Sequence, residues 1–340
     1  MIIERERSAS MFFLFISGTE AARVPGLSAA GANPDVLPFT SGADADVIRF
    51  GRPKAIDCFP MDPEGHPTPA IITRASVLEA DIPVTAVRAG SFLPPEPPYV
   101  ELGASPGHDP RLESSVPSAR AVFESAAAFA ENSAPEGLVM LAESIPGGTT
   151  TALLVLRALG YDCMVSAASP VNPVALKERV WLESSARCGI SAGGMRDDPM
   201  RAIEELGDPM QAAVCGFISG LGGRSEVVLA GGTQMLAVAA CVKALGSALR
   251  MTVATTKYVE SDPSSTFKKT AAEIGVETYA APLDFSSSPY KGLADYEKGY
   301  VKEGVGAGGS VLYAARRGVD VSAVIARTNE LYKDICAGAA

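Results

Sequence analysis

The feature that most constrains this chain is a unit of apolar run, glycine turn and helix that recurs from residue 117 onward. Leu138–Ala142 and Val227–Ala230 are continuous apolar runs, which are typical of strands buried on both faces. Thr149–Ala158 and Thr233–Leu245 follow them with the composition of helices. Strands that alternate with helices predict an α/β fold with a mostly parallel sheet and right-handed crossovers.

The other elements are predicted from shorter patterns. The region before residue 117 is rich in Pro, Gly and Asp, and its short apolar runs predict short strands between turns. The proline-rich segment Phe92–Pro98 predicts an irregular connection. The further expected strands are Phe12–Ile16, Val47–Phe50, Ala70–Ile72, Pro83–Val87, Cys163–Ala167 and Met251–Thr255, and the further expected helices are Ser118–Glu131, Ser310–Arg317 and Asp320–Ile335.

The composition argues against several classes of function. The chain has 39 acidic and 29 basic residues, a net charge of -10 and no basic run. Nucleic-acid binding needs clustered Lys and Arg, so we expect no nucleic-acid partner. Six cysteines without a Cys-x-x-Cys pair, together with only two histidines, predict no metal site.

No apolar segment has the character of a membrane span. Met11–Ile16 is too short, and Val227–Val242 is interrupted by Gly231 and Gly232. The N-terminal run fits a buried strand better than a secretory signal. We therefore expect a cytoplasmic protein without a membrane partner, whose cysteines are small core residues in a reducing compartment.

Three glycine-rich turns precede the helices, and we expect each at the carboxyl end of a strand, where open parallel sheets bind ligands. They lie at Gly147-Gly148, Gly231-Gly232 and Gly304-Val305-Gly306. A helix N-terminus offers free N–H groups and partial positive charge to a phosphate, and glycine lets the ligand approach the backbone. Thr149 and Thr150 add hydroxyls in the first helical turn. Together the turns predict a cradle for a phosphorylated sugar.

Each turn also has a purely structural interpretation, because a glycine pair between strand and helix often serves only a tight turn. None ends in the Gly-Lys-Ser/Thr of a P-loop, and the run Gly304-Val305-Gly306-Ala307-Gly308-Gly309 supports a dinucleotide site only weakly. A dinucleotide-dependent oxidoreductase is therefore disfavoured, while the tight turn and the phosphate cradle both stay open.

Two carboxylates border these turns. Glu143 ends a predicted strand before the first turn, and Glu303 directly precedes the third. A partly desolvated carboxylate beside a substrate has a raised pKa and can accept a proton. The structural alternatives are that Glu143 caps backbone N–H groups and that Glu303 is a solvated residue paired with Lys302. The residues alone leave these alternatives open.

The turns and their flanks together resemble the archaeal and cyanobacterial branch related to nicotinate-nucleotide–dimethylbenzimidazole phosphoribosyltransferase. The resemblance runs from about residue 15 to the C-terminus. The motifs that carry it are Pro25–Pro34, Ser41–Ala45, Gly103–Asp109, Glu143–Leu153, Leu229–Val238 and Val301–Gly309.

The resemblance implies a Rossmann-like α/β fold with a smaller helical subdomain, paired as a homodimer. Residues 1–290 would form the main nucleotide-binding domain, and residues 291–340 would add the third glycine turn and helices to the subdomain. The implied reaction moves the phosphoribosyl group of nicotinate mononucleotide to a benzimidazole-type base, giving α-ribazole phosphate and nicotinate for the lower ligand of cobalamin. The small-molecule substrates are the implied partners, and no cofactor is implied.

The resemblance also implies roles for particular residues. Glu303 would be the base that removes the N–H proton of the acceptor as its other ring nitrogen attacks C1′. Glu143 would lie near the ribose and the acceptor, and Ser28 would lie in the acceptor pocket. The phosphoribosyl part would be held by Gly147, Gly148, Thr149, Thr150, Gly231, Gly232, Gly304 and Gly306.

The resemblance assigns the phosphate contacts less precisely to individual residues. A phosphate-binding lysine of the family falls at Lys177 or Arg179, and the motif does not decide between them. Ser288 is the best match to a further phosphate contact.

The chain departs from the family around the pocket. Gly148 replaces an Asn, Gln234 replaces an acidic residue, and Thr255–Lys257 replaces a segment with an Asp. The acceptor therefore stays open between dimethylbenzimidazole, another benzimidazole and adenine. A non-enzymatic alternative is a regulatory or partner protein that binds the nucleotide and has lost the chemistry.

Overall fold

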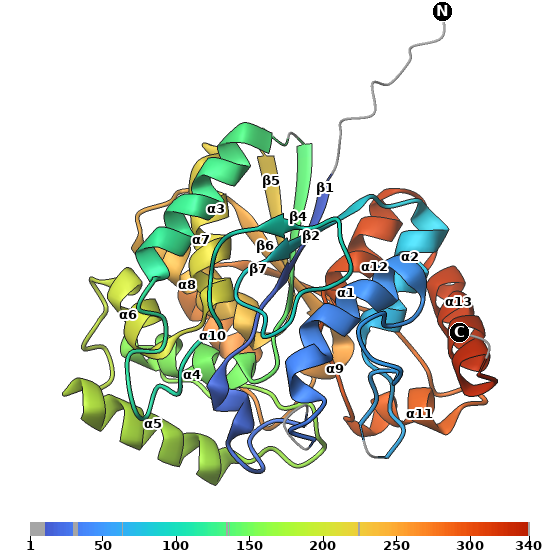
Figure 1. The fold of residues 1–340 in the computed structure, drawn as a ribbon, viewed down its shortest axis with the longest axis horizontal. Coiled ribbons are helices and arrows are strands. Elements are labelled where there is room, and N and C mark those ends of the chain that lie inside the picture. The colour runs from blue at the N-terminus through green and yellow to red at the C-terminus, as the bar shows by residue number, and fades with distance from the viewer. Residues whose placement is uncertain are drawn as a thin grey trace, which may run out of the picture.

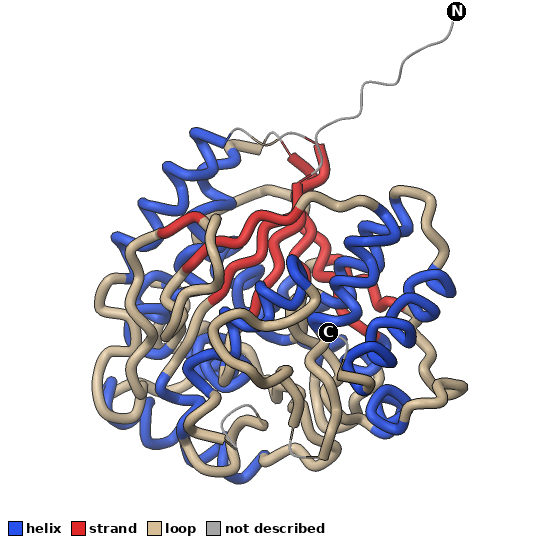
Figure 2. The backbone as a smooth tube through the Cα atoms, turned by 45° about the vertical axis from the view of Figure 1, so that its right-hand side comes forward, coloured by secondary structure: helices blue, strands red, loops and turns tan. Residues whose placement is uncertain are grey.

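The backbone is organised around one parallel sheet of seven strands in the order β3-β2-β1-β4-β5-β6-β7. The structure is a computed structural model that describes residues 11–29, 33–62, 64–133, 135, 137–223 and 225–338. Helices cover both faces of the twisted sheet (Figures 1 and 2), which confirms the α/β class. The strands are β1 (Met11–Ile16), β2 (Val84–Arg88), β3 (Val100–Glu101), β4 (Gly137–Ser144), β5 (Ser225–Ala230), β6 (Met251–Thr256) and β7 (Glu277–Ala281).

The strand order changes direction between β1 and β4. β1 pairs with β2 on one side and with β4 on the other, so that Phe15 lies opposite Glu143 and Ile16 opposite Ser144. In open α/β sheets the crevice for ligands forms at this switch point, outside the carboxyl ends of the strands. The topology therefore places Glu143 at the position where such sheets bind ligands.

The strands have apolar side chains on both faces because each face has its own helical layer. Phe13 and Phe15 of β1 belong to one core, while Phe12, Leu14 and Ile16 belong to the other. The first layer contains α3 (Ala119–Ser133), α4 (Gly148–Ala158), α5 (Val174–Cys188), α6 (Pro199–Leu206), α7 (Pro209–Leu221), α8 (Thr233–Ala244) and α10 (Phe267–Ile274).

The second layer lies on the right of the sheet in Figure 1. It joins segments from both ends of the chain, because α2 packs against both α12 and α13. Its helices are α1 (Thr40–Phe50), α2 (Ala70–Ala80), α11 (Lys291–Ala294), α12 (Ala307–Arg316) and α13 (Val321–Cys336); the short elements η1 (Glu20–Arg23), η3 (Leu37–Phe39), α9 (Lys257–Glu260) and η4 (Asp295–Lys298) lie in connections.

Three predicted strands were wrong. Val47–Phe50 and Ala70–Ile72 are parts of α1 and α2, because short apolar runs do not distinguish a strand from a buried helix. Cys163–Ala167 is extended but irregular, since β5 takes the place beside β4 and the backbone of Met164 bonds instead to Thr266. Phe92–Pro98 is irregular, as predicted.

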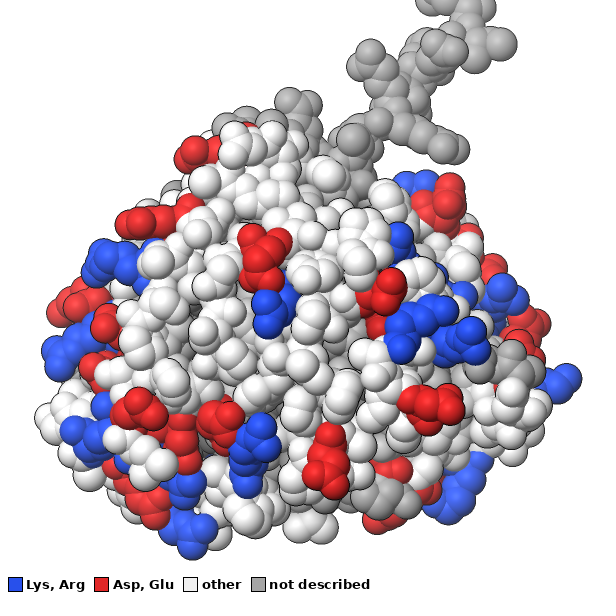
Figure 3. All heavy atoms as spheres, in the orientation of Figure 1, with Lys and Arg blue, Asp and Glu red and all other residues white. Residues whose placement is uncertain are grey.

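The C-terminal part of the chain packs against the main sheet. α12 contacts β4, β5, β6 and β7, and the predicted division at residue 290 stays a prediction. No helix within the described part of the chain is long and apolar enough to span a membrane. On the face drawn in Figure 3, acidic and basic side chains are interspersed around the rim and the centre is mostly uncharged.

Candidate functional site

The three glycine turns meet at the carboxyl edge of the sheet, although only the first two directly follow a strand. A Cβ atom placed on Gly231 would lie 3.1 Å from Oε1 of Glu143, and one on Gly232 would lie 3.8 Å from Cγ of Glu303. Gln234 joins the first and second turns, because its side chain is the neighbour of both Gly148 and Gly232. The second turn therefore lies between the two candidate carboxylates.

The Glu303 carboxylate lies at the N-terminus of α12. It accepts hydrogen bonds from the backbone N–H of Gly304 at 3.1 Å and of Gly308 at 3.3 Å, and from Oγ1 of Thr255 at 3.3 Å. Burial raises the pKa of Glu303 to about 7, although these donors act in the opposite direction. A carboxylate with this pKa accepts protons readily near neutral pH.

Glu303 does not pair with its neighbour Lys302, so that structural alternative does not hold. The Lys302 ammonium lies instead 2.7 Å from Oδ2 of Asp262. Among the described residues, the hydrogen-bond donors to the Glu303 carboxylate are all neutral, and these leave it free to exchange a proton.

Glu143 is buried at the end of β4, with 1% of its surface exposed. Its Oε1 atom has no hydrogen-bond partner within the described part of the chain. Burial, followed by the nearby charges of Glu303, Asp208 and Asp44, raises its pKa well above the ordinary value. Burial therefore favours the protonated form of Glu143, and in that form its carboxyl can act as a hydrogen-bond donor.

Asp44 and Asp208 complete a group of buried carboxyls, and the sequence indicated no role for either. Asp44 on α1 accepts from Thr68 at 2.7 Å and from Ser144 at 2.8 Å. Asp208 caps α7 and accepts from Thr151 at 2.5 Å. Burial raises the pKa of each to about 6. The Asp-Pro pair at the start of α7 is a helix-start signal that would have located Asp208.

Two unpartnered hydroxyls lie in the first turns of α4 and α8. The Oγ1 atoms of Thr150 in α4 and Thr233 in α8 are buried and have no partner among the described residues. The N-cap residues of α4 and α8 are Gly147 and Gly232, so neither helix has a side-chain cap. Buried polar groups are normally satisfied, so these two N-termini are suited to an anionic ligand. Thr149, the first hydroxyl of α4, is partly exposed.

The third turn has a packing role that its sequence did not reveal. A Cβ atom on Gly306 would lie 2.5 Å from Cβ of Ala142, and one on Gly309 would lie 2.2 Å from Cβ of Ala230. These glycines let α12 pack directly against β4 and β5. The turn does not follow a strand, since α11 and η4 separate it from β7, and it reaches the sheet edge through Thr255 and Glu303.

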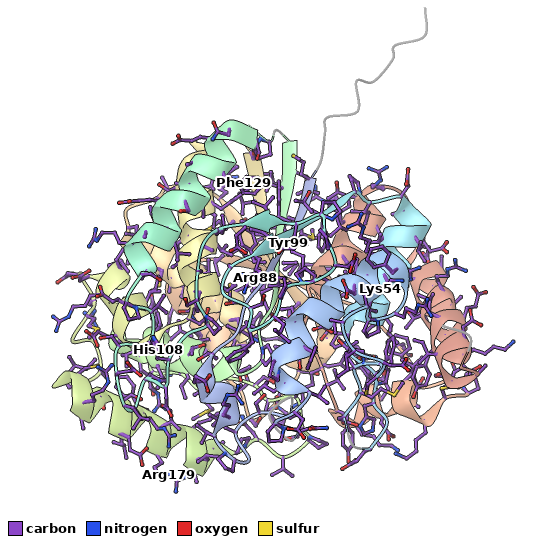
Figure 4. All side chains as sticks on the ribbon, viewed as in Figure 1. Lys54, Arg88, Tyr99, His108, Phe129 and Arg179 are labelled. Carbon is purple, nitrogen blue, oxygen red and sulfur yellow. The ribbon has the colours of Figure 1, made fainter. Side chains whose placement is uncertain are left out.

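Lys177 and Arg179 lie on opposite sides of α5: the first side chain is buried and the second is exposed. Lys177 is fully buried and donates to O of Ser166 at 2.7 Å and to Oδ1 of Asn172 at 2.8 Å. Burial lowers the pKa of Lys177 to about 7. Arg179 is exposed and lies at the outer edge of α5, away from the sheet (Figure 4). Lys177 is thus the residue that faces the interior, but its ammonium group already binds the 166–172 loop.

The two predicted serines lie outside this cluster of contacts. Ser288 donates to Oδ1 of Asn329 on α13 at 2.6 Å. Ser28 is partly buried in the loop after η1. No described group of three or more His, Cys, Asp or Glu side chains is arranged to hold a metal ion.

Between pH 5 and pH 7 the stability of the protein should fall as pH rises. The pKa values of Asp44 and Asp208 are about 6 and that of Glu303 is about 7, all above their ordinary values. The folded state therefore holds protons that the unfolded chain releases, and this stabilisation is lost as pH passes the folded pKa values. Calorimetry should give a Tm at least about 5 °C lower at pH 7 than at pH 5.

The opposing contribution of Lys177 lies outside this pH window. Its lowered pKa makes the folded state bind fewer protons than the unfolded chain, and this acts above about pH 7. A Tm that is constant or rises between pH 5 and pH 7, at one ionic strength, would show that these carboxyls are not buried as described.

Comparisons with known proteins place the chain among archaeal relatives. It is 47% identical over 329 residues to a UPF0284 protein of Pyrococcus furiosus, covering 96% of this chain and 99% of the relative. It is 49% identical over 327 residues to one of Thermococcus gammatolerans, covering 95% and 98%. The chain belongs to the UPF0284 family. No protein-family model matches this UPF0284 chain.

Solved structures share the fold of this UPF0284 protein. Nicotinate-nucleotide–dimethylbenzimidazole phosphoribosyltransferase from Thermus thermophilus aligns with a TM-score of 0.60 and 15% identity, covering 97% of this chain and 86% of that one. A second structure, CobT from the same organism, aligns with a TM-score of 0.59 and 16% identity, covering 95% and 83%. The resemblance to an archaeal CobT-like branch, drawn from the sequence, is confirmed: the solved structures share the fold, and the similar sequences are archaeal.

Proposed function

We propose that this UPF0284 protein transfers the phosphoribosyl group of nicotinate mononucleotide to 5,6-dimethylbenzimidazole or a related base. The observation that carries the proposal is the position of Glu303, a partly buried carboxylate with a pKa near 7, beside the Gly231-Gly232 turn. The shared fold with a phosphoribosyltransferase of that specificity supports it.

The chemistry needs few groups. The nicotinate ring of the donor is cationic at the nitrogen bound to C1′, so nicotinate leaves readily once an acceptor nitrogen attacks. The enzyme has to align the acceptor with C1′ and remove one proton from the acceptor ring. Glu303 would take that proton, and the N-termini of α4 and α8 would hold the phosphoribosyl group. The same arrangement would serve in each protomer of a homodimer.

The two glutamates would differ in protonation state. Burial favours the protonated form of Glu143, which would donate a hydrogen bond to the ribose or the acceptor, while ionised Glu303 would accept the proton. The buried site is closed around Glu143, so substrate would enter from the side of the partly exposed Glu303.

The Glu143→Gln variant should fold like the wild type and melt at an equal or higher temperature at pH 8. An amide has nearly the shape of a protonated carboxyl, and it cannot acquire the buried charge that disfavours Glu143 ionisation. Transfer should fall less than about tenfold, because glutamine keeps a hydrogen-bond donor. Thermal melts and initial rates measure both effects. In the contrasting variant Glu143→Ala, a lower Tm is expected from the cavity; a large loss of stability in Glu143→Gln would instead show that the carboxylate is ionised.

The proposed function is tested by incubating the protein with nicotinate mononucleotide and separate bases, namely dimethylbenzimidazole, benzimidazole and adenine. Release of nicotinate together with a nucleotide of the added base supports transfer and identifies the acceptor. Product with adenine alone would assign the same donor to a different acceptor. Tight binding of the donor without product from any base would leave a nucleotide-binding regulatory or partner protein as the function.

A further inference from the structure

The segment that carries Glu303 has an unusual backbone. Val301 and Lys302 have φ values of 60° and 63°, and Val305 has a φ of 56°. This left-handed region is unfavourable for residues with a side chain, and most of all for β-branched ones. The N–H of Lys302 donates to O of Tyr300 at 2.6 Å, and that of Glu303 donates to O of Val301 at 2.9 Å. Two successive three-residue turns of a rare, strained kind therefore precede the carboxylate.

Strained backbone persists only where surrounding contacts fix it. The N–H of Val301 donates to O of Ala168 at 2.6 Å, and Oγ1 of Thr256 donates to O of Lys302 at 2.5 Å. These two bonds attach the segment to the 168 loop and to the end of β6. They fix the path of the main chain but leave the direction of the Lys302 side chain undetermined.

The Lys302 side chain makes a buried ion pair. Its Nζ atom lies 2.7 Å from Oδ2 of Asp262, and the exposed fractions of the two side chains are 6% and 4%. The same oxygen accepts from Oγ of Ser166 at 2.5 Å, while Oδ1 accepts from Oγ of Ser264 at 2.7 Å. Burial acts to raise the pKa of Asp262, but these bonds together outweigh it and lower the pKa to about 2, so the carboxylate is ionised throughout the physiological range.

An ion pair at this depth is a costly way to stabilise a fold, since apolar residues of similar size often serve as well. Its geometric effect is specific, however. Lys302 and Glu303 are adjacent in the chain, yet their charged groups bind different partners. With Lys302 drawn to Asp262, the Glu303 carboxylate turns to the N-terminus of α12 and to Thr255.

We propose that the Lys302–Asp262 ion pair is a positioning device, which holds the left-handed turns and so directs the Glu303 carboxylate to the N-terminus of α12 and to Thr255, beside the Gly231-Gly232 turn. The inference rests on the proposed function for its catalytic meaning. The pair itself does not touch the reacting atoms. It separates the cation at 302 from the base at 303, and it links α5 to the site, because Lys177 binds O of Ser166 while Oγ of Ser166 binds Asp262.

The test compares Lys302→Met with the wild type. The carboxyl resonance of Glu303 is identified by its absence in Glu303→Gln and titrated by carbon-13 NMR, and hydrogen exchange is followed at the amides of 302 and 303. In Lys302→Met the released carboxylate should reach solvent, so its pKa should fall by at least one unit, and both amides should exchange at least tenfold faster. Lys302→Arg, which keeps the charge, should recover most of both changes.

The matched control is Lys298→Met, four positions before Lys302 in the chain. It removes a surface ammonium that lies 2.7 Å from Asp295. It should leave the titration of Glu303 and the exchange of both amides unchanged. A folded Lys302→Met variant with wild-type titration and exchange would overturn the proposal.

The Lys302→Met variant leaves the buried Asp262 carboxylate without its cation, which by itself could prevent folding. A second variant separates that effect from the positioning role. The double variant Lys302→Met with Asp262→Asn contains no unpaired charge, and it should fold and reproduce the effects of the single variant. Failure of the double variant to fold would overturn the proposal, because it would make the pair part of the core and not a positioning device.

These readouts do not need turnover, so the inference can be judged even if no base is transferred. Where transfer is observed, the positioning role predicts that kcat falls at least tenfold in Lys302→Met with little change in the KM for the nucleotide. The acidic limb of the kcat/KM profile should also move to lower pH. Absence of transfer in the wild type, with the titration changed as expected, would reject the proposed function and retain the positioning role.

Discussion

Replacement of Glu303 by glutamine should lower kcat for base transfer by about 10²–10⁴-fold, the usual contribution of a positioned general base. Glutamine retains the shape of the side chain but cannot accept the proton. The Kd of the nucleotide donor, measured by calorimetry, should change less than about threefold, because the phosphoribosyl group is expected at the N-termini of α4 and α8. Rapid-mix assays with a saturating acceptor measure kcat.

The pH profile gives an independent check of the same residue. Since the pKa of Glu303 is raised to about 7, its ionised fraction and therefore kcat/KM should rise between about pH 6 and pH 8 and then level off. This limb should be absent in Glu303→Gln. The matched control Glu273→Gln, on the surface of α10, should retain the wild-type rate and profile. Wild-type turnover in Glu303→Gln would remove Glu303 from the role of base.

The Gly308→Ala variant should lose at least about 2 kcal/mol in its free energy of unfolding. A Cβ atom at this position would lie 2.1 Å from the backbone C and O atoms of Thr255. Neither group belongs to a flexible side chain, so α12 would have to move away from β6. The same movement would withdraw the Gly308 N–H from the Glu303 carboxylate. Chemical denaturation with a constant m-value measures the loss.

The direction of this effect opposes helix propensity, which favours Ala over Gly by about 1 kcal/mol within a helix. The exposed residue Ala315 on the same helix provides the control, because Ala315→Gly should cost only about that intrinsic difference. An unchanged or increased stability in Gly308→Ala would contradict the close packing of α12 on β6.

Much of the sheet could be predicted from local sequence. β1, β4, β5 and β6 were predicted because their apolar runs are continuous and are bounded by turn residues. β7 (Glu277–Ala281) was missed, since its side chains are largely half-buried or exposed and give no such run. The errors at α1 and α2 have the complementary cause, because a helix buried on most sides carries short apolar runs that resemble strands.

In the candidate site, too, local sequence marks some residues, while others come together only in the folded chain. The sequence singled out Gly147, Gly231, Glu143 and Glu303 as candidates because each lies next to a strand or helix boundary that it marks, and their roles stay predictions. Asp44 was part of a motif but had no assigned role, and its partner Ser144 lies 100 residues along the chain. Such a contact leaves no local pattern, and only the folded sheet brings α1 to the end of β4.

By itself, the sequence determined the parallel α/β architecture and the position of glycine at three helix N-termini, because strand burial and turn geometry depend on residues close together in the chain. The tertiary structure decided which charges meet. It turned Lys302 to Asp262 and not to Glu303, buried Glu143 beside other carboxyls, and raised the pKa of Glu303 to about 7. These properties depend on desolvation and on neighbours distant in sequence, which no local pattern records.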